Sequence, residues 1–453
     1  MREIIPIELK KLVSSCPKPL YVVGGSVRDY LLGVRSATQD WDICSPMSAE
    51  EFSAIAQANG YSVQSVYRNT GTVKLKAGET DCEYSCFRSD KYVRGIHVPV
   101  EIFFTEDITL DARRRDFTAN ALYYHIQADE FINPLQDISC IQEKRLTTVD
   151  DASKVFGEDG LRLMRLARQA AQLGFQPDEN CLRGATQNAS LILDISPERV
   201  FAELTAILTA ENKYGTEDGA YNGLKLLEKT GVLGYILPEL FKGKGLAQRA
   251  DFHKYDVLEH SLRAVKYAPC DADYTLRLAA LLHDVGKPLC MLRDGNAHAH
   301  TEEGEILCLE ILRRIKAPKK TVQTVAWLVK WHMYDFDCKT GENKLRRFLV
   351  SNAPNISLLL ALKQADFSAC TDDTSIAPTC RKWNALLEKM RRENVPFSLK
   401  QLAVKGDDLL SAGIEKQKIG DVLHGLLMHT AVCPRDNERD RLLKLARGIA
   451  NAL

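Results

Sequence analysis

The spacing of apolar residues changes repeatedly along the first third of the chain. Short runs rich in β-branched and aromatic residues, such as "LYVV" at 20–23 and "WDICS" at 41–45, have the pattern of buried strands. The stretches that begin at Ser26 and Ser48 have the period of amphipathic helices. Four further strands are predicted between residues 61 and 104, in "YSVQSVY", "GTVKLKA", "CEYSCFR" and "PVEIFF". The alternation predicts a small domain with helices around a mixed sheet.

The pattern becomes almost entirely helical after about residue 151. A polar, glycine-containing stretch at 211–223, "ENKYGTEDGAYNG", is typical of a boundary between two helical pieces. We therefore predict an α+β protein with three parts. They are a head over residues 1–150, an all-helical neck over 151–215, and an all-helical body and tail over 216–453.

Composition restricts the function classes. The chain has 453 residues, too many for one core, and its 60 basic and 60 acidic residues give no net charge. Any nucleic-acid-binding surface must therefore be local. The 13 cysteines contain no C-x-x-C pair, which argues against a zinc ribbon or a disulfide framework and indicates a reducing, cytoplasmic location. No apolar run approaches the roughly 20 residues of a membrane span, so we expect no membrane association.

Two acids occupy one face of a predicted strand. Asp40 and Asp42 are two residues apart, so their side chains project together while Trp41 projects from the opposite face. Two carboxylates this close repel each other unless a cation lies between them. Mg²⁺ prefers oxygen ligands and is often held by one or two carboxylates with substrate phosphates. Taken alone, the pair is more typical of a solvated strand end.

The residues upstream of the acids favour the metal interpretation. Gly24 and Gly25 follow an apolar strand and precede a helix. Backbone N–H groups at such a turn can bind phosphate, and Arg28 on the first helical turn can add a charged fork. Either feature alone is common. The order strand, Gly-Gly, Arg, helix and strand with two acids is much less common by chance.

This order resembles the signature of class II CCA-adding tRNA nucleotidyltransferases, within the polymerase-β-like superfamily. The resemblance covers about the first half of the chain and rests on five segments in family order: "GGSVRDYLLG", "DWDI", "DARRRDFTANAL", "GEDGLRLMRLARQAAQLGF" and "SPERVFAEL". It implies a polymerase-β-like head, CTP and ATP as substrates, and tRNA as partner through its acceptor arm and 3′ end. It also implies that Asp40 and Asp42 are catalytic and hold Mg²⁺.

The later motifs supply expected nucleotide-binding residues. By resemblance, Arg115 contacts the nucleotide and Asp116 helps to hold its sugar. Asp159, Arg162, Arg165 and Arg168 recur every three residues, which predicts one stripe on a helix. A salt-bridged helix face is the commoner meaning of such a stripe. In the family, the residues that match Asp159 and Arg162 read the base, and Arg165 and Arg168 are expected to support base or phosphate.

Hydrogen-bond chemistry explains how one acid–arginine couple can select bases. Cytosine and adenine both present an amine donor beside a ring-nitrogen acceptor, which a carboxylate and a guanidinium can match. Guanine and uracil present the reversed pair, and leaving buried polar groups unpaired can cost about 10⁴-fold in specificity. The expected reaction is attack of the tRNA 3′-hydroxyl on the α-phosphorus, with release of pyrophosphate.

Three details qualify the resemblance. Glu83 lies where the family has a strand glutamate that can act as a third carboxylate. The segment 87–99, "FRSDKYVRGIHVP", resembles the flexible loop of full CCA-adding and A-adding enzymes. By contrast, "NPLQDISC" at 133–140 lacks the family's hinge glycines, so an enzyme that adds only A stays an alternative.

The helical half carries a second set of ligands. His260, the adjacent His283 and Asp284 of "LLHDVGKP", and Asp366 form a mixed nitrogen and oxygen set for Mg²⁺ or a divalent transition metal. Their order resembles HD-domain metal phosphohydrolases, over about residues 255–370. The resemblance places the following near phosphate: Lys287, His300 and His332. A hydrolase acting on RNA ends, such as 2′,3′-cyclic phosphates or 2′-phosphates, or on nucleotides is therefore a second hypothesis. Basic stretches such as "RRIKAPKK" and "KMRRE" are candidate tRNA contacts or simply solvated helix faces.

Overall fold

A computed structural model describes residues 1–34, 41–77, 80–93 and 96–453. These residues form two compact units. The first contains Met1–Phe241 with Arg314–Lys316, and the second contains Lys242–Arg313 with Ala317–Leu453. Asp40, one of the two predicted metal-binding acids, lies outside the described residues.

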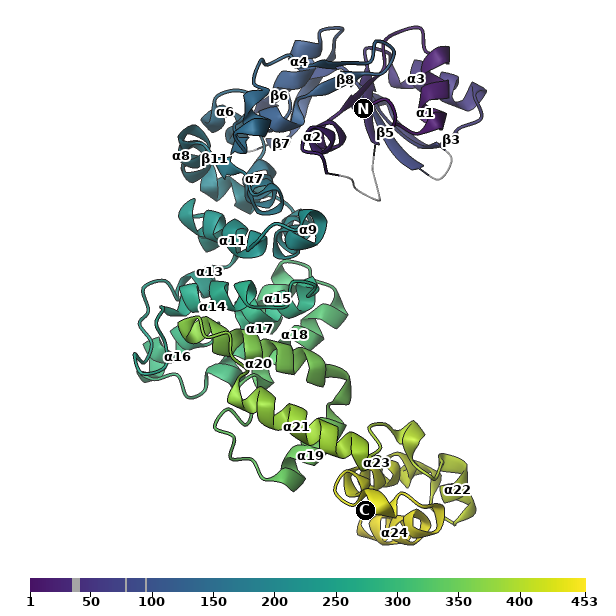
Figure 1. Cartoon of the computed structure of the whole chain (residues 1–453), viewed down its shortest axis with the longest axis vertical. Helices are drawn as coiled ribbons and strands as arrows, with labels where there is room; N and C mark the ends of the chain where they lie inside the picture. The colour runs from purple at the N-terminus through teal and green to yellow at the C-terminus, as the bar shows by residue number, and fades with distance from the viewer. Residues whose placement is uncertain (35–40, 78–79, 94–95) are drawn as a thin grey trace. The chain divides into compact units, whose positions relative to one another are not determined.

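The head is built on a seven-stranded mixed sheet (Figure 1). Its strand order is β3-β4-β5-β2-β1-β8-β9, and only the β2–β5 pair is parallel. The strands are β1 (Tyr21–Val23), β2 (Trp41–Ser45), β3 (Ser62–Tyr67), β4 (Thr72–Ala77), β5 (Thr80–Cys86), β8 (Tyr123–His125) and β9 (Glu130–Ile132). The helices of the head are α1 (Ile7–Ser15), α2 (Gly25–Leu31), α3 (Ala49–Ala58), α4 (Ile108–Arg113) and α5 (Ser139–Gln142).

The head folds where its sequence pattern predicts. The side chain of Ser48 caps α3 by accepting from the N–H of Glu51. The ring of Phe52 on this helix stacks on Tyr84 of β5 at 3.8 Å between centroids, which fixes the helix to the sheet. The α+β class is confirmed, and strands form at each of the predicted positions in the sheet, but β8 and β9 were not predicted.

The segment expected as a flexible loop contains regular structure. Strands β6 (Arg88–Val93) and β7 (Ile96–Phe104) pair antiparallel as a separate two-stranded sheet, which we call the arm. The loop expectation for 87–99 was therefore wrong for most of that segment. The reason is its content of Val, Ile, Tyr and Phe, which favours strands once a pairing partner is available.

The rest of the first unit is helical, apart from two short paired strands, β10 (Arg145–Leu146) and β11 (Gln176–Pro177). Helix α7 packs against α9 and α11, and α6 packs against α8 (Figure 1). The helices are α6 (Ala152–Glu158), α7 (Leu161–Leu173), α8 (Glu179–Asn188), α9 (Pro197–Leu208), α10 (Glu211–Tyr214), α11 (Gly219–Lys229), α12 (Val232–Ile236) and α13 (Pro238–Phe241).

The second unit is helical as predicted. Helices α14, α15, α18 and α20 pack together. His260 lies on α14 and Asp366 on α20, while His283 and Asp284 directly follow the end of α15. The first six helices are α14 (Val257–Lys266), α15 (Tyr274–Leu282), α16 (Lys287–Asp294), α17 (His300–Arg314), α18 (Lys319–Trp331) and α19 (Glu342–Ser351). The last five are α20 (Ile356–Thr371), α21 (Pro378–Arg392), α22 (Gly406–Ser411), α23 (Ile419–Thr430) and α24 (Arg439–Ala452).

The sequence predicted no disulfide framework and no membrane-spanning segment. All 13 cysteines are free thiols. In the part of the chain that the structure describes, none of the helices combines the length and apolar character needed to cross a bilayer.

Candidate functional site

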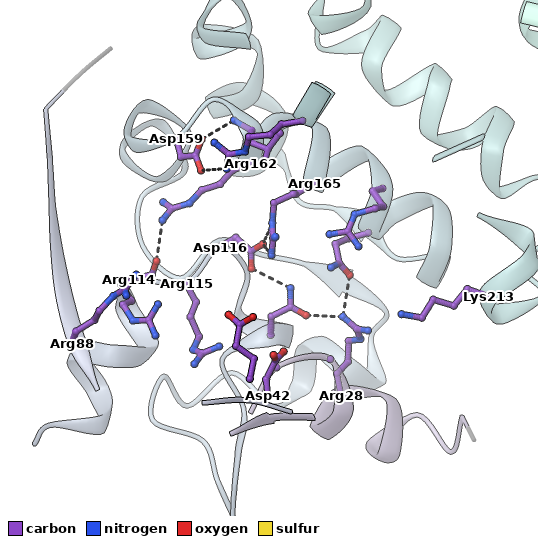
Figure 2. A pocket seen from close by; sticks show the side chains of 18 residues that line it. Arg28, Asp42, Arg88, Arg114, Arg115, Asp116, Asp159, Arg162, Arg165 and Lys213 are labelled. Carbon is purple, nitrogen blue, oxygen red and sulfur yellow. Dashed lines mark hydrogen bonds and ion pairs between the residues drawn. The ribbon is translucent and has the colours of Figure 1, made fainter. Parts of the chain in front are cut away.

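A cleft of about 720 Å³ in the first unit collects the predicted nucleotide-binding residues. Figure 2 shows Asp42 and Arg28 on one side of it, Asp159 and Arg162 on the other, and Asp116 with Arg165 between them. The described residues of its lining include nine basic and four acidic side chains, so the cleft suits a polyanion. Its basic residues are Arg28, Arg88, Arg114, Arg115, Arg162, Arg165, Arg168, Arg199 and Lys213.

The acidic end of the cleft lies on two neighbouring strands. Asp42 of β2 and Glu83 of β5 are direct partners in the parallel register, and both line the cleft. Asp42 is exposed, whereas its neighbours Trp41 and Ile43 are buried. Two exposed carboxylates side by side fit a divalent cation, with Mg²⁺ as the hard ion that such oxygens prefer.

A glycine turn brings the backbone against these acids. Gly24 has φ of +79°, a backbone conformation that residues other than glycine rarely adopt, and it directly precedes α2. A Cβ atom at this position would lie 3.3 Å from Oδ2 of Asp42 and 4.0 Å from Nη1 of Arg115. The turn therefore keeps room for a ligand between the glycine, the acid and the arginine.

Arg28 connects the head to the neck. Its buried guanidinium donates to Asn120 Oδ1 at 2.6 Å, to Gln169 Oε1 at 3.0 Å and to the hydroxyl oxygen of Tyr214 at 2.9 Å. It also pairs with Asp29 at 2.6 Å. These contacts hold α2 against α7 and α10, and the phosphate contact proposed for Arg28 stays a prediction.

The arginines of "RRD" are organised by a buried acid that sequence reasoning did not single out. Asp111 accepts from Arg114 at 2.7 Å, from Arg115 at 3.1 Å and from the Tyr123 hydroxyl at 2.7 Å. Burial raises the pKa of Asp111, but the two arginines and the hydrogen bonds outweigh it and lower the pKa to about 2. Arg115 is thereby oriented into the cleft beside Asp42.

Asp116 lies between the two ends of the cleft. Its carboxylate accepts from Arg165 Nε at 2.7 Å, from Asn120 Nδ2 at 3.1 Å and from the N–H of Phe117 at 2.8 Å. Although burial acts in the opposite direction, Arg165 and these hydrogen bonds lower the pKa of Asp116 well below its usual value. Asp116 is therefore ionised at neutral pH, and Arg165 is fixed next to it.

Asp159 and Arg162 line the same cleft, but they do not share a helix. Asp159 follows the end of α6 with extended backbone, and α7 begins only at Leu161. The prediction of a single helical stripe was wrong at this residue, because Asp159 acts as a local cap and accepts from the N–H of Leu161 at 3.0 Å. Arg165 and Arg168 do follow on α7, where Arg168 pairs with Glu203 at 2.6 Å.

The buried Arg162 guanidinium is held by the protein on several sides. It donates to Glu158 Oε2 at 2.8 Å, to the carbonyl of Val155 at 2.9 Å and to the carbonyl of Arg114 at 2.9 Å. These bonds fix the direction of its planar fork, which is what recognition of a base edge requires.

The arm contacts both predicted base-reading residues. The ring of Tyr92 lies 5.5 Å from the Arg162 guanidinium carbon. Nδ1 of His97 accepts from the N–H of Gly160 at 3.2 Å and lies 4.0 Å from Asp159. Sequence reasoning missed both residues, because only the three-dimensional docking of the arm brings them to the neck. It also missed Arg199, 3.8 Å from Asp159, although the "SPERVFAEL" segment contains it.

The second unit brings together all four predicted HD residues. Nε2 of His260 lies 3.1 Å from Nε2 of His283 and 3.0 Å from Oδ1 of Asp366, and Oδ2 of Asp284 lies 3.3 Å from Nε2 of His283. His283, Asp284 and His332 form a second group of close ligand atoms. Gly286 makes this packing possible, because a Cβ there would lie 2.2 Å from the carbonyl oxygen of His300.

The electrostatics of this cluster fit a cation. Burial lowers the pKa of His283, but Asp284 and Asp366 outweigh it and raise the pKa to about 10. Asp284 is almost wholly buried, and an ionised buried carboxylate needs a positive partner. Lys287 supplies one, with Nζ 2.6 Å from Oδ2 of Asp284. Imidazole and carboxylate ligands at this spacing suit a divalent metal.

Three family models match successive parts of the chain. The poly A polymerase head domain matches residues 20–147, the probable RNA and SrmB-binding site of polymerase A matches 174–243, and the HD domain matches 257–366. Fold and cleft together define a nucleotidyltransferase joined to an HD domain. Both kinds of domain depend on metal ions, and each has a carboxylate-containing ligand set here.

Comparison with known proteins identifies the family more closely. The A-adding tRNA nucleotidyltransferase of Deinococcus radiodurans is 33% identical over 79% of this chain and 78% of its own. The CC-adding tRNA nucleotidyltransferase of Thermus thermophilus is 32% identical over 77% and 76%. This chain belongs to the tRNA nucleotidyltransferase family. The crystal structure of the Bacillus stearothermophilus CCA-adding enzyme in complex with CTP has the same fold, with a TM-score of 0.67, 23% identity and coverage of 98% and 96%.

Proposed function

We propose that this protein adds C, C and A to the 3′ end of tRNA, using CTP and ATP and no nucleic-acid template. The observation that carries this proposal is the single cleft that contains both the Asp42–Glu83 pair and the Asp159–Arg162 couple. A nucleoside triphosphate has its reacting phosphate at one end and its base at the other, so a site for it needs both features.

Base selection is assigned to Asp159 and Arg162. A carboxylate accepts from the exocyclic amine of cytosine or adenine, and a guanidinium donates to the neighbouring ring nitrogen. Arg162 is pre-oriented by its bonds to Glu158 and Val155, so little ordering is needed when the base binds. Guanine and uracil leave the same groups unpaired and are rejected.

The middle of the cleft is assigned to sugar and phosphates. Asp116 lies where it can accept from a ribose hydroxyl, and Arg115, Arg165 and Arg168 neutralise the triphosphate. The Gly24–Gly25 turn allows the phosphates to approach the backbone beside Asp42.

The acids complete the reaction site. Asp40 and Asp42, with Glu83 beside Asp42, would hold Mg²⁺, which when bound supplies positive charge near the attacking and leaving oxygens. The tRNA 3′-hydroxyl oxygen forms the new bond to the α-phosphorus as the bond to pyrophosphate breaks. The chain's own residues contribute mainly orientation and charge.

A direct test uses tRNA that ends before the CCA sequence. The full chain is incubated with this tRNA, Mg²⁺ and one labelled nucleotide at a time. We expect two additions with CTP alone, one further addition when ATP follows, and none with GTP or UTP. Incorporation of GTP or UTP at rates similar to CTP would contradict the assignment of Asp159 and Arg162.

A protein that adds only the terminal A is the second candidate. The segment 133–140, which lacks the family's hinge glycines, is held by Asp137, which accepts from Thr118 at 2.9 Å and from Arg145 at 3.1 Å. A segment held in this way moves less readily, which favours an enzyme that adds one base over one that changes between two. Addition of A to tRNA ending in CC, without addition of C to shorter tRNA, would select this candidate.

We assign the second unit a metal-dependent phosphohydrolase activity on 2′,3′-cyclic phosphate or 2′-phosphate ends, with Mg²⁺ or a divalent transition metal. The buried His260, His283, Asp284 and Asp366 set supports it. Release of phosphate from such ends, lost in Asp284→Ala and retained in Asp42→Ala, tests this assignment. The 13 free thiols support a cytoplasmic location.

A further inference from the structure

A histidine and a cysteine lie next to the HD ligand set without belonging to it. One ligand atom from each of His253, His260 and Cys370 lies within 4.8 Å of the others. The ring of His253 meets the ring of His260 edge-on, with 4.9 Å between centroids. It is the first of five successive histidine rings in contact, the others being His260, His283, His332 and His300.

Two of these imidazoles carry unsatisfied nitrogens. Within the described residues, the buried Nδ1 atoms of His253 and His260 have no hydrogen-bond partner. His260 itself is completely buried. Buried polar atoms are nearly always paired, and an unpaired one indicates a missing water or ion. Two unpaired nitrogens on the two histidines of this group are an observation independent of the short spacing.

The backbone holds His253 and Cys370 together. The N–H of Lys254 donates to the carbonyl of Cys370 at 2.9 Å. Two residues beyond the cysteine, Asp372 accepts from Tyr255 and, at 2.8 Å, from Tyr267. The loop that carries His253 is therefore fastened to the end of α20, which carries Cys370, and the two ligands are preorganised.

We propose that His253 and Cys370, with His260, form a thiolate-containing metal position adjoining the HD centre. This goes beyond nucleotide addition and beyond the oxygen and nitrogen ligands of the HD set. Nitrogen and sulfur ligands select a borderline transition ion such as Zn²⁺ or Co²⁺, whereas Mg²⁺ prefers oxygen. On binding, the S–H bond of Cys370 breaks, its proton passes to solvent and the sulfur bonds to the metal.

Cobalt provides a spectroscopic test on the full chain. The protein is stripped with a chelator and titrated with Co²⁺. We expect a sulfur-to-cobalt charge-transfer absorption in the near ultraviolet, and this absorption should be absent from Cys370→Ser. In His253→Gln, the apparent affinity for Co²⁺ should be at least tenfold weaker. The metal content of Cys370→Ser is expected to fall by one equivalent per chain.

Cys380 is a matched control. It is a thiol of the same unit, and its Sγ donates to the carbonyl of Leu360 at 3.4 Å, just as Cys370 donates to the carbonyl of Asp366 at 3.4 Å. Cys380→Ser should retain the absorption and the metal content. Absence of the absorption from the unmodified protein, or its persistence in Cys370→Ser, would overturn the proposal.

A second measurement needs no variant and so does not depend on folding of the mutants. Alkylation of Cys370 by iodoacetamide is followed by mass spectrometry with Zn²⁺, with Mg²⁺ or with neither. Zn²⁺ should slow the modification at least tenfold, and Mg²⁺ should leave it unchanged. Equal rates under all three conditions would refute a thiolate ligand.

Discussion

Asp42 and Glu83 are direct neighbours on the parallel strands β2 and β5 and point into the same cleft. This pairing makes Glu83 a partner of Asp42, the acid that we propose holds the metal. We expect Glu83→Gln to lower kcat for nucleotide addition by about 10- to 100-fold, the usual cost of losing such a partner. KM for the nucleotide should change less.

The control for Glu83 lies on the same strand. Asp81 of β5 does not line the cleft, and Asp81→Asn should retain the unmodified rate. Steady-state addition of labelled CTP to tRNA measures both variants. An equal loss of kcat in the two variants would show that the effect comes from disturbing the strand and not from removing the Glu83 carboxylate.

Asp159 should control which base is accepted. Asn in its place can donate as well as accept, so it tolerates the reversed pattern of guanine and uracil. A hydrogen bond to a charged group contributes about 1.5–3 kcal/mol, so Asp159→Asn should reduce discrimination against UTP by roughly 10- to 150-fold. Competition between CTP and UTP in kcat/KM measures this. Unaltered discrimination would show that another residue reads the base.

The arm should contribute to nucleotide binding through His97. Its bond to the N–H of Gly160 fixes the start of α7 next to Asp159. We expect His97→Ala to raise KM for nucleotides about two- to tenfold, since a neutral hydrogen bond contributes about 0.5–1.5 kcal/mol. Val98→Ala, at an exposed neighbour, is the control. A similar KM in the two variants would rule out the positioning role.

Asp111 makes the head sensitive to acid. Its folded pKa is about 2, below the unfolded value near 3.8, so the folded chain binds fewer protons between these values. The stabilisation is therefore complete above about pH 4 and is lost as pH falls through about 2. Asp111→Asn should cost about 2 kcal/mol at pH 7, and its difference from the unmodified chain should vanish near pH 2.

Hydrogen exchange of the head strands measures the difference in stability between Asp111→Asn and the unmodified chain. The measurement does not require the two units to unfold together. The exposed Asp81→Asn variant should stay within about 0.5 kcal/mol of the unmodified protein at every pH. A constant difference between Asp111→Asn and the unmodified chain from pH 7 to pH 2 would exclude the ionised acid as its source.

Local pattern was enough to predict most of the fold. The strands around Val22 and Ile43 and the capped helix at Ser48 follow from short-range spacing, which the folded structure retains. Strand β6 did not follow, because it forms only by pairing with β7, as between Arg88 and Phe104, whereas "PVEIFF" within β7 was predicted as a strand. Asp159 was placed on a helix because a three-residue repeat does not reveal where a helix begins.

The site residues could be predicted where they lie together in short sequence motifs. The HD residues are brought together as expected, and Asp42, Asp159 and Arg162 share one cleft. The role of Arg28 in joining α2 to the neck was not readable, because its partners Gln169 and Tyr214 come from distant segments. Asp40 lies outside the described residues, so its role rests on the alternation of the strand and on the resemblance of "DWDI" to the family signature.

The most direct test compares two single substitutions in the full chain. Asp42→Ala removes the carboxylate that we propose holds Mg²⁺ in the head, and Asp284→Ala removes a buried carboxylate of the second unit. Their single-turnover rates of CTP and ATP addition to tRNA lacking CCA are measured side by side. Loss of several kcal/mol of charge stabilisation predicts a drop of roughly a thousandfold in Asp42→Ala and an unchanged rate in Asp284→Ala. Full activity in Asp42→Ala would contradict the account.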